Sequence, residues 1–159
     1  VYSDPVSEKS LRQSLPYCFK EHLYPGVPKI SLHTIHPHEE LQINELKVVP
    51  LRIMHDKLPI LGFKIGKLAY ITDMKTIPEE ELDFLQDIDC LVVNALRFTN
   101  AHHSHMLVDE ALAFARRTSA KRVFFTHMCH DIGLHEEVNK ILPAGTQLAY
   151  DGLTVEVDV

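Results

Sequence analysis

Five of the eleven histidines lie within one stretch, residues 102–130, which reads HHSHMLVDEALAFARRTSAKRVFFTHMCH. Its first half carries apolar residues at the spacing of one helix face: Leu107, Ala111, Phe114 and Ala115. Ser104 is a suitable cap for the start of that helix. The run Arg122-Val-Phe-Phe-Thr is then typical of a buried strand. The stretch therefore predicts a helix followed by a strand, with histidines at both ends.

Two of these histidines stand where ligands gather in α/β proteins. His105 opens the predicted helix, and His127 follows the carboxyl end of the predicted strand, where open α/β sheets bind their ligands. A single histidine is more often a surface residue or a satisfied polar group. The position at the end of an element is what favours His105 and His127 as functional residues. We expect them to meet across the helix–strand unit.

The size and composition fit one domain with one hydrophobic core. The 159 residues are 45% hydrophobic and 24% charged, and no apolar run is long enough for a membrane span. The first ten residues have neither the basic nor the apolar region of a signal peptide. The three cysteines are far apart, which predicts reduced thiols in a cytoplasmic protein. The net charge of −6 argues against general nucleic-acid binding.

The remaining pattern predicts a β-rich first part followed by alternating strands and helices. Helices are expected over residues 6–22, with a break at Pro16, and over 78–85 and 132–142. Strands are expected over residues 29–35, 46–54, 60–65, 67–72, 89–95 and 147–150. Pro50 indicates an edge strand or a bulge. A last strand over 153–157 should pair through a hairpin at Asp151-Gly152. This order favours a layered α/β sandwich over a doubly wound sheet.

Four polar residues stand at the ends of these elements. His55 follows LRIM, Asp73 follows AYIT, and His105 and His127 flank the helix–strand unit. Imidazole and carboxylate groups are ligands of divalent metal ions. Rigid elements could direct all four side chains to one place, so the spacing favours a metal site.

These residues carry a resemblance to a known family. The segments MHDKLPILGFKIGKLAYITD, SHMLVDEA, VFFTHMCH and AYDGLTVEV are similar to the metallo-β-lactamase-fold hydrolases, and most to the phosphoribosyl cyclic phosphate phosphodiesterases. The resemblance covers nearly the whole chain and is strongest from Pro50 onward. It implies an α/β fold, specifically a partial αββα sandwich with mixed sheets and flanking helices. It also implies a metal-dependent hydrolase that opens a small cyclic phosphodiester.

The resemblance assigns a role to each residue of the constellation. His55 matches a ligand of one divalent metal ion, Zn or Mn, and His127 matches a ligand of a second ion. Asp73 matches the aspartate that bridges the two ions. His105 matches the histidine that acts as general acid or binds the phosphate. His130 matches a recurring histidine that would orient His127 through a hydrogen bond.

One departure from the family pattern is large. The hallmark His-x-His-x-Asp-His is absent, and His33-Thr-Ile-His36-Pro-His38 lacks its Asp-His pair and is interpreted as a polar loop. Residues 1–159 would then be one domain, the C-terminal portion of a longer hydrolase. Such a fragment should bind metal weakly or not at all and be nearly inactive. It should also expose a sheet face that pairs with a second copy.

Two alternatives remain open at this point. One is the tRNA 3′-processing endonuclease of the same fold, although the chain is acidic and no basic, Gly/Pro-rich arm for tRNA is evident. The other is a non-catalytic metal-binding or interaction domain. Neither the substrate nor the metal is identified by the residues alone.

Overall fold

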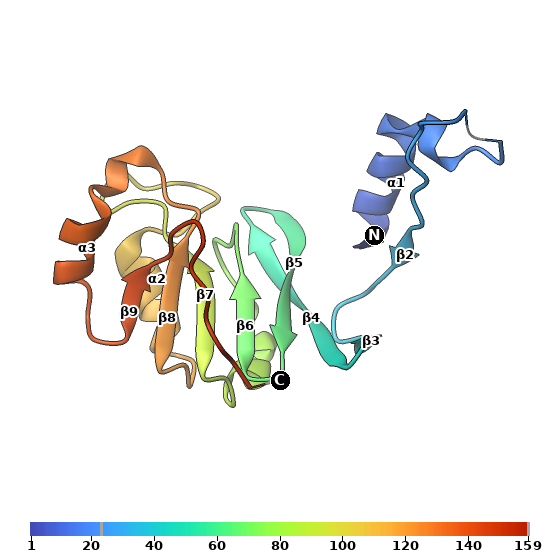
Figure 1. Ribbon diagram of the computed structural model, residues 1–159. Helices are drawn as coiled ribbons and strands as arrows, with labels where there is room; N and C mark the ends of the chain where they lie inside the picture. Colours follow the sequence, from blue (N-terminus) through green and yellow to red (C-terminus); the bar gives the residue numbers. More distant parts are fainter. Residues whose placement is uncertain (23, 159) are drawn as a thin grey trace.

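The structure, a computed structural model, describes residues 1–22 and 24–158. Its centre is a seven-stranded mixed sheet in the order β3-β4-β5-β6-β7-β8-β9 (Figure 1). The strands are β3 (Leu41–Ile43), β4 (Leu46–His55), β5 (Leu58–Ile65), β6 (Leu68–Ile71), β7 (Cys90–Asn94), β8 (Arg122–Thr126) and β9 (Thr146–Leu148). The predicted α/β class, with a mixed sheet and flanking helices, is confirmed.

The strands β3 to β6 form an antiparallel meander. The predicted turn at Gly66 joins β5 to β6, and a two-residue turn at Asp56-Lys57, which sequence analysis did not predict, joins β4 to β5. Pro50 lies within β4 opposite Phe63, on the side where β3 has already ended. On that side its carbonyl accepts a hydrogen bond from the His38 amide at 2.8 Å, and no residue of β3 stands opposite Pro50 to need its missing amide hydrogen. Pro50 thus marks an edge, as predicted, and not a bulge.

The strands β6 to β9 are parallel, and helices cover one face of the sheet. The helical elements on this side are η2 (Glu79–Leu85), α2 (Val108–Ala115), η3 (His130–Ile132) and α3 (His135–Ile141). Every second strand residue points into the core beneath them, among them Ile53, Ile71, Leu91, Val93 and Phe125. This alternation places the core between sheet and helices.

Three predicted helices differ from the observed ones. The segment 78–85 is a 3₁₀ turn, η2, and 132–142 is divided into η3 and α3 at Gly133, whose φ is 106°. The helix after His105 begins only at Val108. Sequence periodicity identified the apolar faces correctly but overestimated the lengths.

The C-terminal segment crosses the opposite face of the sheet. The predicted strand 153–157 is wrong: after the turn at Asp151-Gly152 this segment runs over β8, β7 and β6 without joining a ladder (Figure 1). It is fixed by the Lys67 amide, which donates to the Asp158 carbonyl at 2.9 Å, and by Arg122, which donates to the Glu156 carbonyl at 2.9 Å. Apolar residues of the segment and the sheet line a cavity of about 280 Å³ between them: Tyr70, Val92, Phe124, Leu153, Val155 and Val157.

The N-terminal residues lie to one side of the sheet (Figure 1). They form β1 (Tyr2–Ser3), α1 (Pro5–Ser14), η1 (Pro16–Phe19) and β2 (His33–Thr34). The break at Pro16 is confirmed, whereas the strand predicted over 29–35 is reduced to two residues paired with β1. Asp4 caps α1 by accepting hydrogen bonds from the amides of Val6 and Ser7. Among the described residues no helix is long and apolar enough to cross a membrane.

Candidate metal centre

The four residues singled out in the sequence meet at one edge of the sheet. His55 ends β4, Asp73 follows β6 and His127 follows β8. Because β4, β6 and β8 run in the same direction, their carboxyl ends lie at the same edge. His105 reaches this edge from the loop before α2. Sequence reasoning therefore identified the location from strand ends alone.

The side chains converge on the carboxylate of Asp73. Its Oδ1 lies 3.4 Å from Nε2 of His105 and 3.3 Å from Nε2 of His127. Ligand atoms of His55, Asp73 and His105 all lie within 4.8 Å of one another. The His105 ring stacks on His127, with ring centroids 4.7 Å apart, and meets the edge of His55 at 4.8 Å. The compact triad of His55, Asp73 and His105 thus includes the residue that was expected to be the acid. His127 lies beside this triad and contacts its Asp73 carboxylate.

The donor set suits a divalent metal ion. Imidazole nitrogens and one carboxylate are ligands that Zn²⁺ and Mn²⁺ accept, and the carboxylate stands between the imidazoles, as a bridging group would. His55, Asp73 and His127 would hold the ions, with His105 beside them. The residues present therefore fit the cofactor that the resemblance implies.

The backbone is left-handed at two of these positions. Asp73 has φ of 59° and His127 has φ of 57°, a conformation uncommon outside glycine. His127 follows β8 directly and Asp73 follows β6 after one residue, so each turns the chain sharply at the sheet edge. Strained backbone of this kind gathers at functional sites when the surroundings hold it in place.

Asn94 holds the backbone next to Asp73. Its side chain is fully buried, accepts a hydrogen bond from the Met74 amide at 2.8 Å and donates to the Met74 carbonyl at 3.0 Å. Sequence analysis missed this residue, although it is the one amide in the apolar run Cys90-Leu-Val-Val-Asn94. A polar residue buried in a strand is expected to satisfy a specific partner.

His105 is more enclosed than its neighbours. Its side chain is 12% exposed, and burial lowers its pKa despite the hydrogen bond to Asp73, which acts in the opposite direction. His127, His55 and His102 add repulsion to the protonated form. The pKa of His102 is also lowered, first by desolvation and then by His103. The neutral imidazole of His105 is therefore favoured in this environment.

The loop that carries His105 differs from the prediction. Ser104 does not cap α2, because its side chain is turned inward, to the rings of His102 and His105. Leu107 occupies the N-cap position instead, and the hydrogen bond there is made by its amide, which donates to Glu110 Oε2 at 2.7 Å. His105 consequently precedes the helix and does not open it.

Lys75 braces this loop from the Asp73 side. Its Nζ donates to the carbonyl of His105 at 3.3 Å and to Glu110 at 2.7 Å. Burial opposes ionisation of Glu110, but the hydrogen bonds from Lys75 and the Leu107 amide prevail and keep the pKa of this carboxyl below its usual value. One network thus connects the segment after Asp73 with the segment around His105.

The other histidines lie outside the centre. His130 is 93% exposed and pairs with Asp131 at 3.2 Å, so the geometry gives no support to its expected role in orienting His127. His33 stacks on Tyr2, and His38 stacks on Phe84 and bonds the buried Glu81 at 2.9 Å. The polar stretch from His33 to His38 does not contribute to the cluster, as expected.

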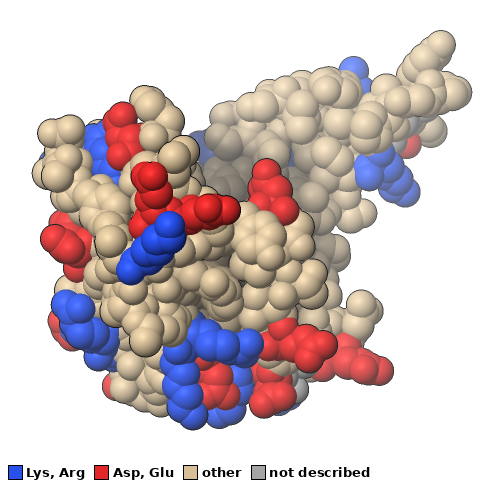
Figure 2. All heavy atoms as spheres, turned by 60° about the vertical axis from the view of Figure 1, so that its left-hand side comes forward, with Lys and Arg blue, Asp and Glu red and all other residues tan. Residues whose placement is uncertain are grey.

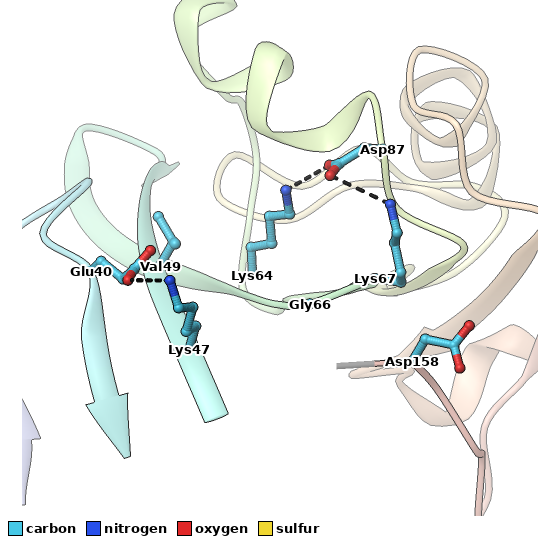
Figure 3. A pocket seen from close by; sticks show the side chains of 8 residues that line it. All are labelled: Glu40, Lys47, Val49, Lys64, Gly66, Lys67, Asp87 and Asp158. Atoms are coloured by element: carbon cyan, nitrogen blue, oxygen red, sulfur yellow. Dashed lines mark hydrogen bonds and ion pairs between the residues drawn. The ribbon is translucent and has the colours of Figure 1, made fainter. Parts of the chain in front are cut away.

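A charged pocket at the opposite edge of the sheet is not a rival site. It measures about 320 Å³ and lies beside the turn at Gly66 (Figure 3). Lys64 and Lys67 both bond Asp87, at 2.6 and 3.6 Å, and Lys47 bonds Glu40 at 3.1 Å. Because its cations are already paired with acids, the pocket presents no free charge to an anion.

Comparisons with known proteins agree with this fold and site. Residues 1–128 match the family described as the beta-lactamase superfamily domain. The chain therefore belongs to the beta-lactamase superfamily, and its architecture is the metallo-β-lactamase fold.

Three further proteins are similar to the chain. It is 34% identical to a diphosphatase from the PhnP family, with a TM-score of 0.85 over 96% of this chain and 55% of that one. It is 38% identical to the octanoyltransferase of Porphyromonas gingivalis over 99% of this chain and 32% of that protein. The short form of human tRNase Z shares the fold, with a TM-score of 0.69 and 15% identity over 99% of this chain and 66% of that one. The chain thus spans about half of the PhnP-family diphosphatase and about a third of the octanoyltransferase.

Proposed function

We propose that this chain carries metal ligands of a hydrolase that cleaves small phosphodiesters. Two divalent ions would bind at the cluster of His55, Asp73, His105 and His127, which we call the Asp73 cluster. The observation that carries the proposal is the convergence of His105 and His127 on one oxygen of Asp73, at 3.4 and 3.3 Å. A carboxylate surrounded by the imidazoles of His55, His105 and His127 is suited to binding divalent ions. The bound ions would supply Lewis acidity toward a phosphoryl group and a nucleophile near neutral pH.

The protein residues divide the remaining work. Asp73 fixes the separation of the ligand groups. The two hydrogen bonds between the Asn94 side chain and the Met74 backbone, which we call the Asn94 clamp, hold Asp73 in place. His105 delivers a proton from Nε2 to the leaving oxygen, or neutralises charge on the phosphoryl group. Its enclosure among His55, His127 and His102 keeps the ring in one place and limits access of water.

A small diphosphate is the second candidate substrate. The support is the 34% identity with the protein described as a diphosphatase from the PhnP family. The same cluster suits either bond, because both reactions transfer a phosphoryl group between oxygens. By contrast, the name of the octanoyltransferase describes a protein of which this chain spans 32%, and no residue described here supports acyl transfer in particular.

RNA is a less suitable substrate. The net charge is −6, and on the face shown in Figure 2 the Lys and Arg side chains alternate with Asp and Glu. Binding of the phosphate backbone of RNA needs a surface on which Lys and Arg side chains are gathered. The likeness to tRNase Z at 15% identity extends to the fold alone.

The test compares substrates at saturating metal. Hydrolysis of a small cyclic phosphodiester, a small diphosphate ester and a tRNA precursor is measured at moderate salt with excess Mn²⁺ or Zn²⁺. We expect slow turnover of a small substrate that disappears in His127→Ala. Faster processing of the tRNA would favour the endonuclease. Metal binding without hydrolysis of any of the three would favour a non-catalytic metal-binding domain.

A further inference from the structure

Ser104 is a buried polar residue that touches two histidines. It is 2% exposed, and its Oγ lies 3.0 Å from Nδ1 of His105 and 3.1 Å from Nδ1 of His102. The two Nδ1 atoms are themselves 3.1 Å apart. Three polar atoms thus form a small triangle behind the ring of His105, on the side away from Asp73.

The position of the hydrogens in this triangle follows from what lies on the other side of the ring. Nε2 of His105 faces Oδ1 of Asp73 at 3.4 Å, and an ionised carboxylate can only accept. The contact is attractive when Nε2 carries a hydrogen and repulsive when it presents a lone pair. In the neutral imidazole a hydrogen on Nε2 leaves Nδ1 as an acceptor. Nδ1 of His105 therefore needs a donor.

The hydroxyl of Ser104 is the suitable donor among the described residues. Nδ1 of His102 is the other polar atom within reach, but it faces the amide of Ser104 at 3.4 Å and so acts as an acceptor itself. One hydroxyl hydrogen is then placed between two acceptors. The Asp73 contact decides that it is given to His105, since only that arrangement satisfies both nitrogens of the His105 ring.

We infer that Ser104 is a positioning residue, whose hydroxyl holds His105 in the tautomer with its hydrogen on Nε2, directed toward Asp73. The inference rests on the proposed function, in which His105 donates that hydrogen in a hydrogen bond to the phosphoryl group and so neutralises its charge. Without the hydroxyl, a hydrogen on Nδ1 of His105 can bond Nδ1 of His102 across 3.1 Å. The ring would then turn a lone pair toward the reaction.

The arrangement of the main chain supports this role. Lys75 donates to the carbonyl of His105 at 3.3 Å, which fixes the backbone while Ser104 acts on the ring. The backbone position of His105 and the tautomer of its ring are thus controlled by separate groups. A variant of Ser104 can therefore change the tautomer and leave the loop in place.

The experiment reads the tautomer directly. Long-range ¹H–¹⁵N spectra of the histidine rings are recorded on the full chain in alkaline buffer with a chelator, and His105 is assigned from its absence in His105→Gln. The two tautomers give distinct ¹⁵N shifts at Nδ1 and Nε2. We expect the Nε2–H form in the wild type and a shift toward the Nδ1–H form in Ser104→Ala. Ser104→Thr, which keeps a hydroxyl, should restore the original form.

A matched control removes a hydroxyl elsewhere. Ser119 donates to the carbonyl of Ile88 at 2.6 Å, so Ser119→Ala loses a hydrogen bond without touching a histidine. It should leave the His105 spectrum unchanged. The inference is overturned by a wild type in the Nδ1–H form, or by an unchanged His105 tautomer in Ser104→Ala.

Hydrolysis adds a second reading. With a small phosphodiester, Ser104→Ala should lower kcat roughly 10- to 100-fold, as the loss of an outer hydrogen-bond partner does at other functional histidines, and leave KM unchanged. A wild type that hydrolyses no phosphodiester would refute the proposed function but not the tautomer assignment. A normal kcat with an altered tautomer would refute the role of Ser104 in positioning.

Discussion

The side-chain amide of Asn94 forms two hydrogen bonds with the backbone of Met74, at 2.8 and 3.0 Å, and so fixes the residue that follows Asp73. Both partners are buried, and the bonds satisfy groups that no strand pairs. Strand β7 thus supplies the support for the carboxylate that stands after β6. The position of Asp73 depends on its neighbour in the sheet as much as on its own strand.

Replacement of Asn94 by leucine should destabilise the protein and disturb the metal centre. The similar shape leaves the amide and carbonyl of Met74 buried without partners, which typically costs about 1–3 kcal/mol for each such group. Denaturant unfolding and Zn²⁺ titration measure the two effects. Asn139→Leu is the control, since Asn139 accepts from the Leu148 amide, outside the four-residue cluster, and should affect stability alone. Unchanged Zn²⁺ affinity in Asn94→Leu would contradict the clamp.

Single substitutions at the centre should separate ligands from the acid. His127→Ala and Asp73→Ala should abolish metal binding and activity together. His105→Ala should keep metal and lose rate by about 10²- to 10⁴-fold, the usual contribution of a general acid. Metal content and kcat are measured on the same samples. If His105→Ala loses metal as completely as His127→Ala, then His105 is a ligand, as its place in the compact triad would allow.

Metal should be held loosely by this chain. Of the proposed ligands, one ion would have His55 and Asp73 and the other Asp73 and His127, fewer than a closed zinc site provides. We expect the metal content to fall well below stoichiometric after dialysis. Elemental analysis of the dialysed protein measures it. Stoichiometric metal that survives dialysis, and that His127→Ala removes, would show that these four side chains are sufficient.

The Lys75–Glu110 pair should contribute to stability above acidic pH only. Hydrogen bonds hold the pKa of Glu110 below its usual value, so the folded state favours the ionised carboxylate. Its contribution is then complete above the unfolded-state pKa and is lost as the pH falls through the lowered folded-state pKa. Denaturation midpoints of the wild type and Glu110→Gln should differ at neutral pH and converge in acid. A constant difference at every pH would contradict the assignment.

The sheet face under the C-terminal segment should favour self-association. Tyr70 is 45% exposed there, beside a cavity lined by apolar residues. Apolar sheet surface of this kind tends to pair with another copy. Sedimentation of the wild type should show dimer, reduced in Tyr70→Glu. Tyr24→Glu, which changes a more exposed tyrosine away from the sheet, is the control, and an equal effect of both would contradict the prediction.

The sequence predicted the residues of the cluster better than the residues that support them. His55, Asp73 and His127 directly follow apolar runs, and a strand end is a local feature that periodicity reveals. Ser104 was expected to cap a helix because that is its common local use. Its hydroxyl contacts two histidines instead. The helix starts later, at the N-cap position Leu107, whose amide donates to the Glu110 side chain. Roles that depend on partners distant in sequence, such as that of Asn94, were not visible.

The C-terminal segment illustrates the same division. The alternating residues Leu153, Val155 and Val157 are the side chains of this segment that line the cavity against the sheet. It could not predict that the segment joins no ladder, because strand formation needs a neighbouring edge as well as a suitable pattern. Periodicity thus determines a face, and tertiary context determines the hydrogen bonds.

The left-handed backbone at Asp73 and His127 decides which variants can report on chemistry alone. Asparagine adopts such a conformation readily and glycine does so freely, whereas a β-branched residue would force the turn to rearrange. Asp73→Asn and His127→Asn therefore remove a charge or a ring while the chain keeps its course. Valine or isoleucine at either place would alter both the ligand and the path of the strand. A mutagenesis series at this centre should therefore avoid β-branched replacements at these two positions.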